Sequence, residues 1–326
     1  MRGPASAHRG DRRLCLGDER TAATIVATRS PREWRRVQDP TVVCIGETLW
    51  DVLPTGMHLG GAPFNVAAHL ARLGVSSILI SRVGADDLGS AALRRARELG
   101  IETPFMQIDP ALPTGEARAV LDRSGSARYD FTSPAAWDAI EATSSALQAV
   151  ARADVVIFGT LAQRSPPARA ALAKFLQAAR WRVFDPNLRE PYVDRGLCLK
   201  LLSCADLVKF NEEEARRFAD WLGCADDAQS LQRMLAQRYR TSTLCITRGA
   251  RGALLYHGGA WTEHAGVATQ VVDTIGAGDA FLALLVAQLL RRESAEAALG
   301  RAARLAAFVA SRPGAVPEYD AALFTG

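Results

Sequence analysis

The sequence lacks the patterns of a membrane protein and of a metal- or disulfide-stabilised one. Its longest apolar stretches, such as Ala280–Ala287, fall well short of the roughly 18 residues needed to cross a bilayer. The six cysteines include no C-x-x-C pair, and the five histidines form no H-x-x-x-H pattern. Several cysteines lie in apolar runs, as in Val42–Ile45. We therefore expect reduced, buried thiols in a cytoplasmic protein rather than disulfides or a zinc site.

Lysine is also scarce, since 36 of the 39 basic residues are arginine and only Lys174, Lys200 and Lys209 are lysine. No G-x-x-x-x-G-K-[ST] motif occurs, which excludes a Walker-type NTPase. Residues 1–39 hold nine arginines and five acids, so they carry the whole net charge of +4. The other residues balance at 30 basic against 30 acidic, which leaves no basic stripe for nucleic acid.

Residues 1–38 differ from the rest of the chain. They are rich in Arg, Gly, Ala, Ser and Pro and show little periodicity. They contain no continuous apolar segment of the kind found in secretory signals, and their acidic residues argue against a mitochondrial transit peptide. We predict a disordered extension over 1–38 and a folded domain over 39–326.

From Thr41 onward the pattern predicts an α/β fold. Hydrophobic residues make up 48% of the chain and charged residues 23%, which is typical of a globular protein with a sizeable core. Apolar strands alternate with helical segments, which indicates a mostly parallel sheet covered by helices on both faces. We predict strands at Thr41–Gly46, Ser77–Val83, Asp154–Phe158, Trp181–Asp185, Asp206–Phe210, Thr243–Thr247 and Ala253–His257. We predict helices at Phe64–Leu73, Asp87–Leu99, Pro167–Ala179, Glu212–Ala219, Ala228–Arg238, Ala280–Arg291 and Ala295–Ser311.

The stretch 104–132 breaks this alternation. Ala117–Asp122 and Ala127–Phe131 flank the turn sequence Arg-Ser-Gly-Ser at 123–126. This pattern predicts a β-hairpin set apart from the main sheet.

Asp273-Thr-Ile-Gly-Ala-Gly-Asp279 leads directly into an apolar helix and is the strongest local signal. Glycines before a helix let the chain turn tightly, and the first N–H groups of a helix bind anions, phosphate above all. Asp279 is then either the N-cap of the helix or a base beside a bound phosphate.

A second glycine-rich element, Gly60-Gly-Ala-Pro-Phe-Asn65, also precedes a helix. Asn65 lies among apolar neighbours, where its amide needs a partner, either a ligand or a backbone carbonyl. Asp51 poses the same choice shortly after the first strand, at the edge where open α/β sheets bind ligands.

Together these elements resemble the ribokinase-like (PfkB-type) sugar kinase family, over roughly residues 41–318. The two signatures are Gly60–Asn65 with the following Ala71-Arg-Leu-Gly74, and Asp273–Asp279. Asn211-Glu-Glu-Glu214 matches the family's N-x-x-E, and Thr247-Arg-Gly-Ala-Arg-Gly252 matches its T-x-G-x-x-G. The resemblance implies a three-layer ribokinase-like fold with a small β lid, formed here by about 48–62 and 104–132.

The resemblance also implies the roles of single residues in an ATP-dependent phosphotransfer. Asp279 would be the base, and Gly276, Ala277 and Gly278 would form the anion hole. Asp51, Gly61 and Asn65 would hold the sugar, while Thr247, Gly249 and Gly252 would line the nucleotide site. Asn211 and Glu214 would place Mg²⁺ and the nucleotide phosphates, with Glu214 acting on the metal indirectly. A monovalent cation such as K⁺ would lie near Asp273, Ile275, Val309, Arg312 and Gly314.

The motif wording around Asp51, Ala135–Asp138, Gly159–Ser165 and Asp185–Arg189 is similar to the fructokinase branch, which implies fructose as the substrate. Arg189 keeps 2-keto-3-deoxygluconate open, and ribose or a nucleoside are further alternatives. Asn211–Glu214 alone would indicate a helix cap, and Thr247–Gly252 alone a turn between strands. A non-catalytic binding protein and a nicotinamide-dependent oxidoreductase are the other hypotheses. The oxidoreductase hypothesis requires a G-x-G-x-x-G after the first strand, and the sequence has none there. The expected partners are sugar and ATP, with no nucleic acid or membrane, and a homodimer formed through the lid.

Removing residues 1–38 tests the predicted extension. The variant should keep a Tm and a kcat/KM close to those of the full chain, because disordered termini add little to native packing. It should also have a pI below 8.8, since it loses the charge excess. A large loss of stability would mean that this segment packs on the body.

Overall fold

The computed structural model describes residues 38–53, 56–121 and 127–325. The predicted extension, apart from its last residue, and the predicted turn at 123–126 lie outside these ranges, as does Cys15. The other five cysteines are free thiols. Among the described residues, no helix combines the length and the hydrophobicity that crossing a membrane requires.

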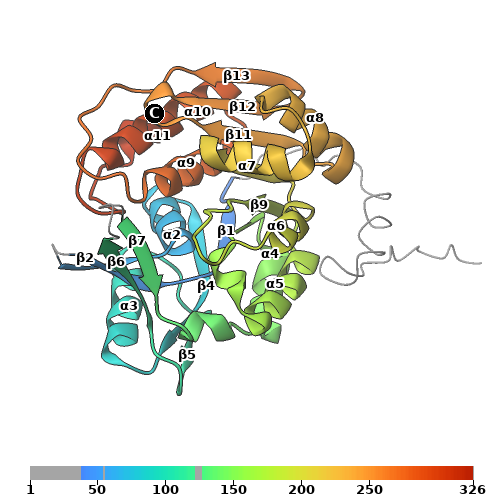
Figure 1. Ribbon diagram of the computed structural model, residues 1–326. Helices are drawn as coiled ribbons and strands as arrows, with labels where there is room; N and C mark the ends of the chain where they lie inside the picture. Colours follow the sequence, from blue (N-terminus) through green and yellow to red (C-terminus); the bar gives the residue numbers. More distant parts are fainter. Residues whose placement is uncertain (1–37, 54–55, 122–126, 326) are drawn as a thin grey trace, which may run out of the picture.

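A nine-stranded sheet in the order β13-β12-β11-β10-β9-β8-β1-β4-β5 forms the centre of the described fold (Figure 1). Neighbouring strands from β11 to β5 in this order pair parallel. The pairs β11–β12 and β12–β13 at the other end are antiparallel. The strands are β1 (Thr41–Ile45), β4 (Ser76–Gly84), β5 (Met106–Asp109), β8 (Val155–Phe158), β9 (Trp181–Phe184), β10 (Leu207–Asn211), β11 (Thr243–Thr247), β12 (Ala253–His257) and β13 (Ala260–His264). The predicted α/β class and mostly parallel sheet are confirmed.

Helices cover both faces of this sheet, which is why its strands are apolar on both sides. In β1, Val42 and Cys44 belong to one hydrophobic core, while Val43 and Ile45 belong to the other. The first core is closed by α2 (Ala62–Arg72), α3 (Asp87–Glu98), α9 (Ala277–Arg291), α10 (Ala295–Ala310) and the short α11 (Ala322–Thr325). The second is closed by α4 (Ser144–Arg152), α5 (Pro166–Ala178), α6 (Arg195–Leu202), α7 (Glu212–Leu222) and α8 (Ala228–Tyr239). Short 3-10 helices are η2 (Ala136–Ala139), η3 (Leu161–Arg164) and η4 (Gly249–Arg251).

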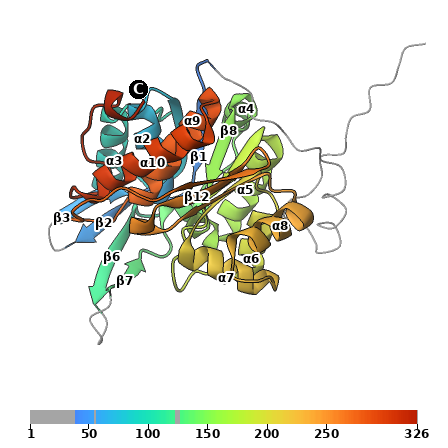
Figure 2. The ribbon, with the colours of Figure 1, turned by 90° about the horizontal axis from the view of Figure 1, so that it is seen from above.

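A separate four-stranded sheet in the order β3-β2-β6-β7 lies beside the main body, and Figure 2 shows β6 and β7 projecting from it. Its strands are β2 (Leu49–Leu53), β3 (Gly56–Gly60), β6 (Gly115–Leu121) and β7 (Ala127–Phe131). The predicted hairpin is β6 and β7, which pair antiparallel and do not join the central sheet. We refer to these four strands as the lid sheet.

One boundary of the predicted lid is wrong. The segment assigned to it begins at 104, but Met106–Asp109 forms β5 and pairs parallel with β4 at the edge of the central sheet. Its four residues show little alternation and only Met106 and Asp109 are buried, so the sequence carries little strand signal there.

Candidate active site

A cavity of about 790 Å³ lies where β1, β9, β10 and β11 end, at the carboxyl edge of the parallel sheet. The lid sheet and the start of α9 contribute to the same walls. The sequence-predicted residues that line it are Asp51, Gly61, Asn65, Asn211, Thr247, Gly249, Ile275, Gly276, Gly278 and Asp279. The fold therefore brings most of the predicted site residues, which span more than 200 positions of sequence, around one cavity.

Helix α9 begins directly after Gly276. This glycine is the N-cap residue with φ of 77°, and no side chain caps the helix. A Cβ on Gly276 would come within 2.6 Å of Ala315, so both the backbone angle and the space require glycine. The first N–H groups of α9 have no partner within the helix, and the cavity wall includes Gly276 and Gly278. This geometry suits an anion at the positive end of the helix dipole.

Asp279 is not the N-cap that the sequence allowed. The helix begins at Ala277 rather than Ala280, so Asp279 lies in its first turn, and its carboxylate accepts a hydrogen bond from Asn65 Nδ2 at 2.8 Å. Burial raises the pKa of Asp279 to about 6, although the Asn65 hydrogen bond acts in the opposite direction. Asn65, which was expected to bind a ligand or a carbonyl, thus has the carboxylate as its amide partner.

Asp51 lies on β2 of the lid sheet and faces the same cavity. Burial raises its pKa to about 6, and Arg189 counteracts part of that rise. Gly60 and Gly61 allow this arrangement: a Cβ on Gly60 would collide with the Asp51 carboxylate, and one on Gly61 with the carbonyl of Glu47. The glycine pair therefore lets β3 lie close to the Asp51 carboxylate and lets the turn before α2 lie close to the backbone after β1.

Asn211 and Glu214 form a capping box at the start of α7, as their spacing alone indicated. Asn211 Oδ1 accepts from the Glu214 amide at 2.8 Å, and Glu214 Oε2 accepts from the Asn211 amide at 2.9 Å. Glu214 Oε1 also accepts from the amide of Leu188 at 3.0 Å. Asn211 and the neighbouring Glu212 and Glu213 line the cavity, whereas Glu214 is buried behind it.

Thr247–Gly252 connects β11 to β12, so it is a turn between strands as well as part of the cavity wall. Thr247 and Gly249 line the cavity. Gly252, with φ of 83°, lies against the backbone after β13, where any Cβ would collide with it. Its position indicates a role in the fold of this turn.

The loop predicted to hold a monovalent cation is organised by Asp273. Its two carboxylate oxygens accept from the amides of Ile275, at 2.9 Å, and Gly314, at 3.1 Å. The amide of Asp273 donates to the carbonyl of Ala310. The two predicted parts, 273–275 and 309–314, therefore lie against each other beside Gly276.

Lys209 and Asp185 were not predicted as site residues. Lys209 Nζ donates to Asp185 Oδ2 at 2.8 Å, both side chains are buried, and Lys209 lines the cavity. A Cβ on Gly278 would lie 3.2 Å from Nζ, so the ammonium lies directly beside the start of α9. Asp185 raises the pKa of Lys209 against the effect of burial, which keeps the ammonium charged. The sequence signal was a lysine, one of only three in the chain, between the apolar residues Val208 and Phe210 of a strand.

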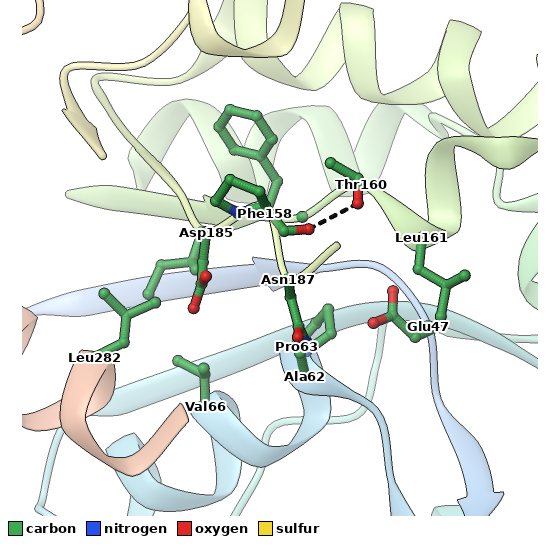
Figure 3. Close-up of a pocket in the computed structure, with 13 residues that line it drawn as sticks. Glu47, Ala62, Pro63, Val66, Phe158, Thr160, Leu161, Asp185, Asn187 and Leu282 are labelled. Atoms are coloured by element: carbon green, nitrogen blue, oxygen red, sulfur yellow. Dashed lines mark hydrogen bonds between the residues drawn. The ribbon is translucent and has the colours of Figure 1, made fainter. Parts of the chain in front are cut away.

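Glu47 is a further buried carboxyl at this edge. It lines the main cavity and also a second cavity of about 10 Å³, which Asp185 reaches as well (Figure 3). Glu47 Oε2 and Asp185 Oδ1 have no hydrogen-bond partner in the described part of the chain. Burial raises the pKa of Glu47 to about 7, and Arg189 counteracts part of that rise.

The described residues contain no group of three or more His, Cys, Asp or Glu side chains placed to hold a metal ion by themselves. The cavity edge does offer the Asn211 amide and the Glu213 carboxylate, and Glu212 beside them pairs with Arg251. Such an open set of oxygen donors fits Mg²⁺, which keeps several waters and takes further ligands from phosphate.

Comparisons with known proteins agree with this geometry. The model of the "pfkB family carbohydrate kinase" matches residues 39–321. A fructokinase from Escherichia coli is 32% identical over 75% of this chain and 83% of its own length. Among solved structures, fructokinase from Xylella fastidiosa with bound ATP has a TM-score of 0.75 at 26% identity, covering 85% of this chain and 94% of that one. Fructokinase from Vibrio cholerae bound to fructose, ADP and calcium has a TM-score of 0.73 at 25% identity, covering 88% and 99%.

The family match spans both glycine-rich elements, the buried carboxylate and the lid sheet. The predicted family and the predicted ribokinase-like fold are confirmed. The chain therefore belongs to the pfkB family of carbohydrate kinases and is a sugar kinase.

Proposed function

We propose that this sugar kinase transfers the γ-phosphoryl group of ATP to a hydroxyl of fructose. The observation that carries the proposal is the buried Asp279, which shares one cavity with Gly276 and Gly278 at the start of α9 and with the lid residue Asp51. The relatives named fructokinase support fructose, and the bound ATP of the Xylella fastidiosa enzyme supports the nucleotide.

Asp279 acts as the general base. Held by Asn65, its carboxylate takes the proton of the attacking hydroxyl as the oxygen forms a bond to the γ-phosphorus. The bond from that phosphorus to the β-phosphate oxygen breaks at the same time, and ADP leaves. The N–H groups of Gly276, Ala277 and Gly278, with the Lys209 ammonium beside them, stabilise the charge on the transferring group.

The other residues position the substrates. Asp51, Gly61 and Asn65 hold the sugar, while Thr247, Gly249 and the turn formed around Gly252 accommodate the nucleotide. Mg²⁺, when bound, neutralises the phosphate charge. Asn211 and Glu213 offer it oxygen donors, and Glu214 fixes their loop from behind. The loops joined by Asp273 would hold a monovalent cation such as K⁺ through oxygen donors.

The lid sheet excludes water from the sugar, because water would otherwise accept the phosphoryl group. Within the described residues, β3 and β7 are the edges of this sheet, and an edge strand can pair with a second copy. A homodimer formed through the lid is part of the proposal.

A coupled ADP-release assay across fructose, ribose, glucose, 2-keto-3-deoxygluconate and adenosine tests the substrate. Fructose should give the highest kcat/KM. Arg189 lies in the cavity, where it could neutralise a carboxylate, so 2-keto-3-deoxygluconate is the second candidate. A preference for that acid would replace fructose, and turnover of none of the five would contradict the proposal.

Asp279→Asn tests the base. Asn keeps the shape and can still pair with Asn65, but it cannot accept the proton. We expect kcat to fall by about 10²-fold or more with Tm nearly unchanged, the usual scale for loss of a general base. Turnover close to wild type would remove Asp279 from the mechanism.

The pH profile tests the same residue without a substitution at it. Asp279 must be ionised to act, and burial raises its pKa to about 6. Activity should therefore be lost as pH falls through about 6, with kcat/KM reporting the free enzyme. Asp51 has a similarly raised pKa, so Asp51→Asn is the control. That variant should keep the acid limb in kcat/KM, at lower values throughout; disappearance of the limb would assign it to Asp51.

Glu214→Gln tests the indirect metal role. Gln can replace only one of the two acceptor oxygens that hold the Asn211 and Leu188 amides. The Mg²⁺ concentration for half-maximal activity should rise more than the sugar KM does. If Tm falls while the Mg²⁺ titration is unchanged, Glu214 is a helix cap alone.

A further inference from the structure

Arg164 is a buried arginine at the junction of four segments, and the proposed mechanism gives it no role. It is the last residue of η3, and its side chain is 6% exposed. Its Nε and Nη2 donate to the two carboxylate oxygens of Asp138, at 2.8 and 2.7 Å, and Nη2 also donates to the carbonyl of Thr132. Its guanidinium lies 3.8 Å from the ring centre of Trp137 and 4.8 Å from that of Tyr192. We refer to these five residues as the Arg164 cluster.

Stability alone does not account for such a cluster. A buried ion pair is often no more stabilising than apolar side chains of similar volume, because both charges lose their hydration. Asp138 is itself buried and accepts from the Ala135 amide as well, so the carboxylate is fixed from two sides. A planar, bidentate guanidinium also fixes geometry, because its hydrogen bonds hold several segments at a set distance and angle.

Three of the segments that meet at Arg164, those of β7, η3 and 187–192, continue into the wall of the sugar side of the cavity, whereas η2 does not line it. Thr132 follows Phe131, the last residue of β7, and Phe131 lines the cavity. Phe131 packs edge-on against Tyr192, with ring centres 5.9 Å apart. Tyr192 ends the segment 187–192, in which Asn187 and Arg189 both line the cavity.

The other end of η3 completes the connection. Leu161, its first residue, lines the cavity, and Thr160 before it donates to the carbonyl of Pro186 at 2.7 Å (Figure 3). The 186–192 segment is therefore contacted at both ends of η3, by Thr160 before its start and by Arg164 at its end. Arg164 also bonds to Thr132, the residue that follows the lid strand β7. Arg164 itself is not part of the cavity wall.

We propose that Arg164 is a positioning residue for the sugar: it sets the position of β7 and of the 187–192 segment relative to each other, and so the shape of the sugar pocket. The inference rests on the proposed sugar-kinase mechanism. It predicts a larger effect on sugar affinity than on ATP affinity. Helix α7, next to the nucleotide wall, contacts the 187–192 segment through Glu214 and Arg217, and neither residue bonds to the Arg164 cluster among the described interactions.

Arg164→Met and Arg164→Lys, measured with fructose and ATP, test this. Met removes the charge and every hydrogen bond; Lys keeps the charge but cannot hold Asp138 and Thr132 in one plane. We expect the fructose KM to rise about 10-fold or more in both variants, because small misplacements of a binding wall cost affinity. The ATP KM, and kcat at saturating fructose, should change by less than about threefold.

Arg182→Met is the matched control. Arg182 is also buried and binds both carboxylate oxygens of Asp206, at 3.0 and 3.1 Å, but at the amino-terminal ends of β9 and β10, away from the cavity. It should lower Tm as Arg164→Met does and leave the fructose KM unchanged. If Arg164→Met lowers Tm without a change in fructose KM, or if Arg182→Met raises that KM equally, the inference is wrong.

Amide hydrogen exchange gives a readout that does not depend on turnover. Fructose at about twice the wild-type KM should slow exchange in 129–132 of the wild type, and at the same concentration Arg164→Lys should lose most of this protection, because less sugar is bound. If Arg164→Met does not fold, Arg164→Lys decides the question, and protection equal to wild type there overturns the inference. Failure of fructose as the substrate would appear in the wild type itself, and the best sugar of the five-compound panel would then replace it.

Discussion

The hydrogen bond from Asn65 to Asp279 joins the two helices on which the site depends. Helix α2 brings the glycine-rich turn and Asn65 to one wall of the cavity, and α9 brings Gly276 and Gly278 to another wall. Because α9 is buried along nearly its whole length, its position is set by the core, and its first turn cannot move without disturbing that core. One side-chain contact thus fixes the proposed base, Asp279, relative to both glycine-rich walls of the cavity.

Charge is the second constraint on this arrangement. Asp51, Glu47 and Asp279 all lie against the cavity, and burial raises the pKa of each. Lys209, Arg189 and the positive end of α9 lie among them, so the cavity offers both a carboxylate to take a proton and fixed positive charge for a phosphoryl group. The pairing of Lys209 with Asp185 keeps one of these charges in place at the cavity wall.

The sequence predicted the parts of the fold with strong hydrophobic patterns. Thr243–Thr247 and Ala253–His257 agree with β11 and β12 to the residue, and the central helices differ by few residues. It missed β5, β13, α4 and α6, which are short, and α4 buries only Ala146 and Val150. The place of Asp279 in the cavity was predicted from its motif. Its hydrogen bond to Asn65 was not, because packing of α2 on α9 brings the two residues together. Lys209 was missed because a single lysine in a strand does not indicate which residue it pairs with. Asp185 can be identified as its partner only once β9 and β10 are known to be neighbours.

The central claim is that Asn65 contributes to phosphoryl transfer by holding Asp279. A double-mutant cycle of Asn65→Ala and Asp279→Asn, with kcat measured at saturating sugar and ATP, tests it most directly. If Asn65 acts through Asp279, the double variant should have the same kcat as Asp279→Asn alone, because the base that Asn65 positions is already gone. Losses in kcat that multiply across the two substitutions would contradict the account, since Asn65 would then act on the reaction independently of Asp279.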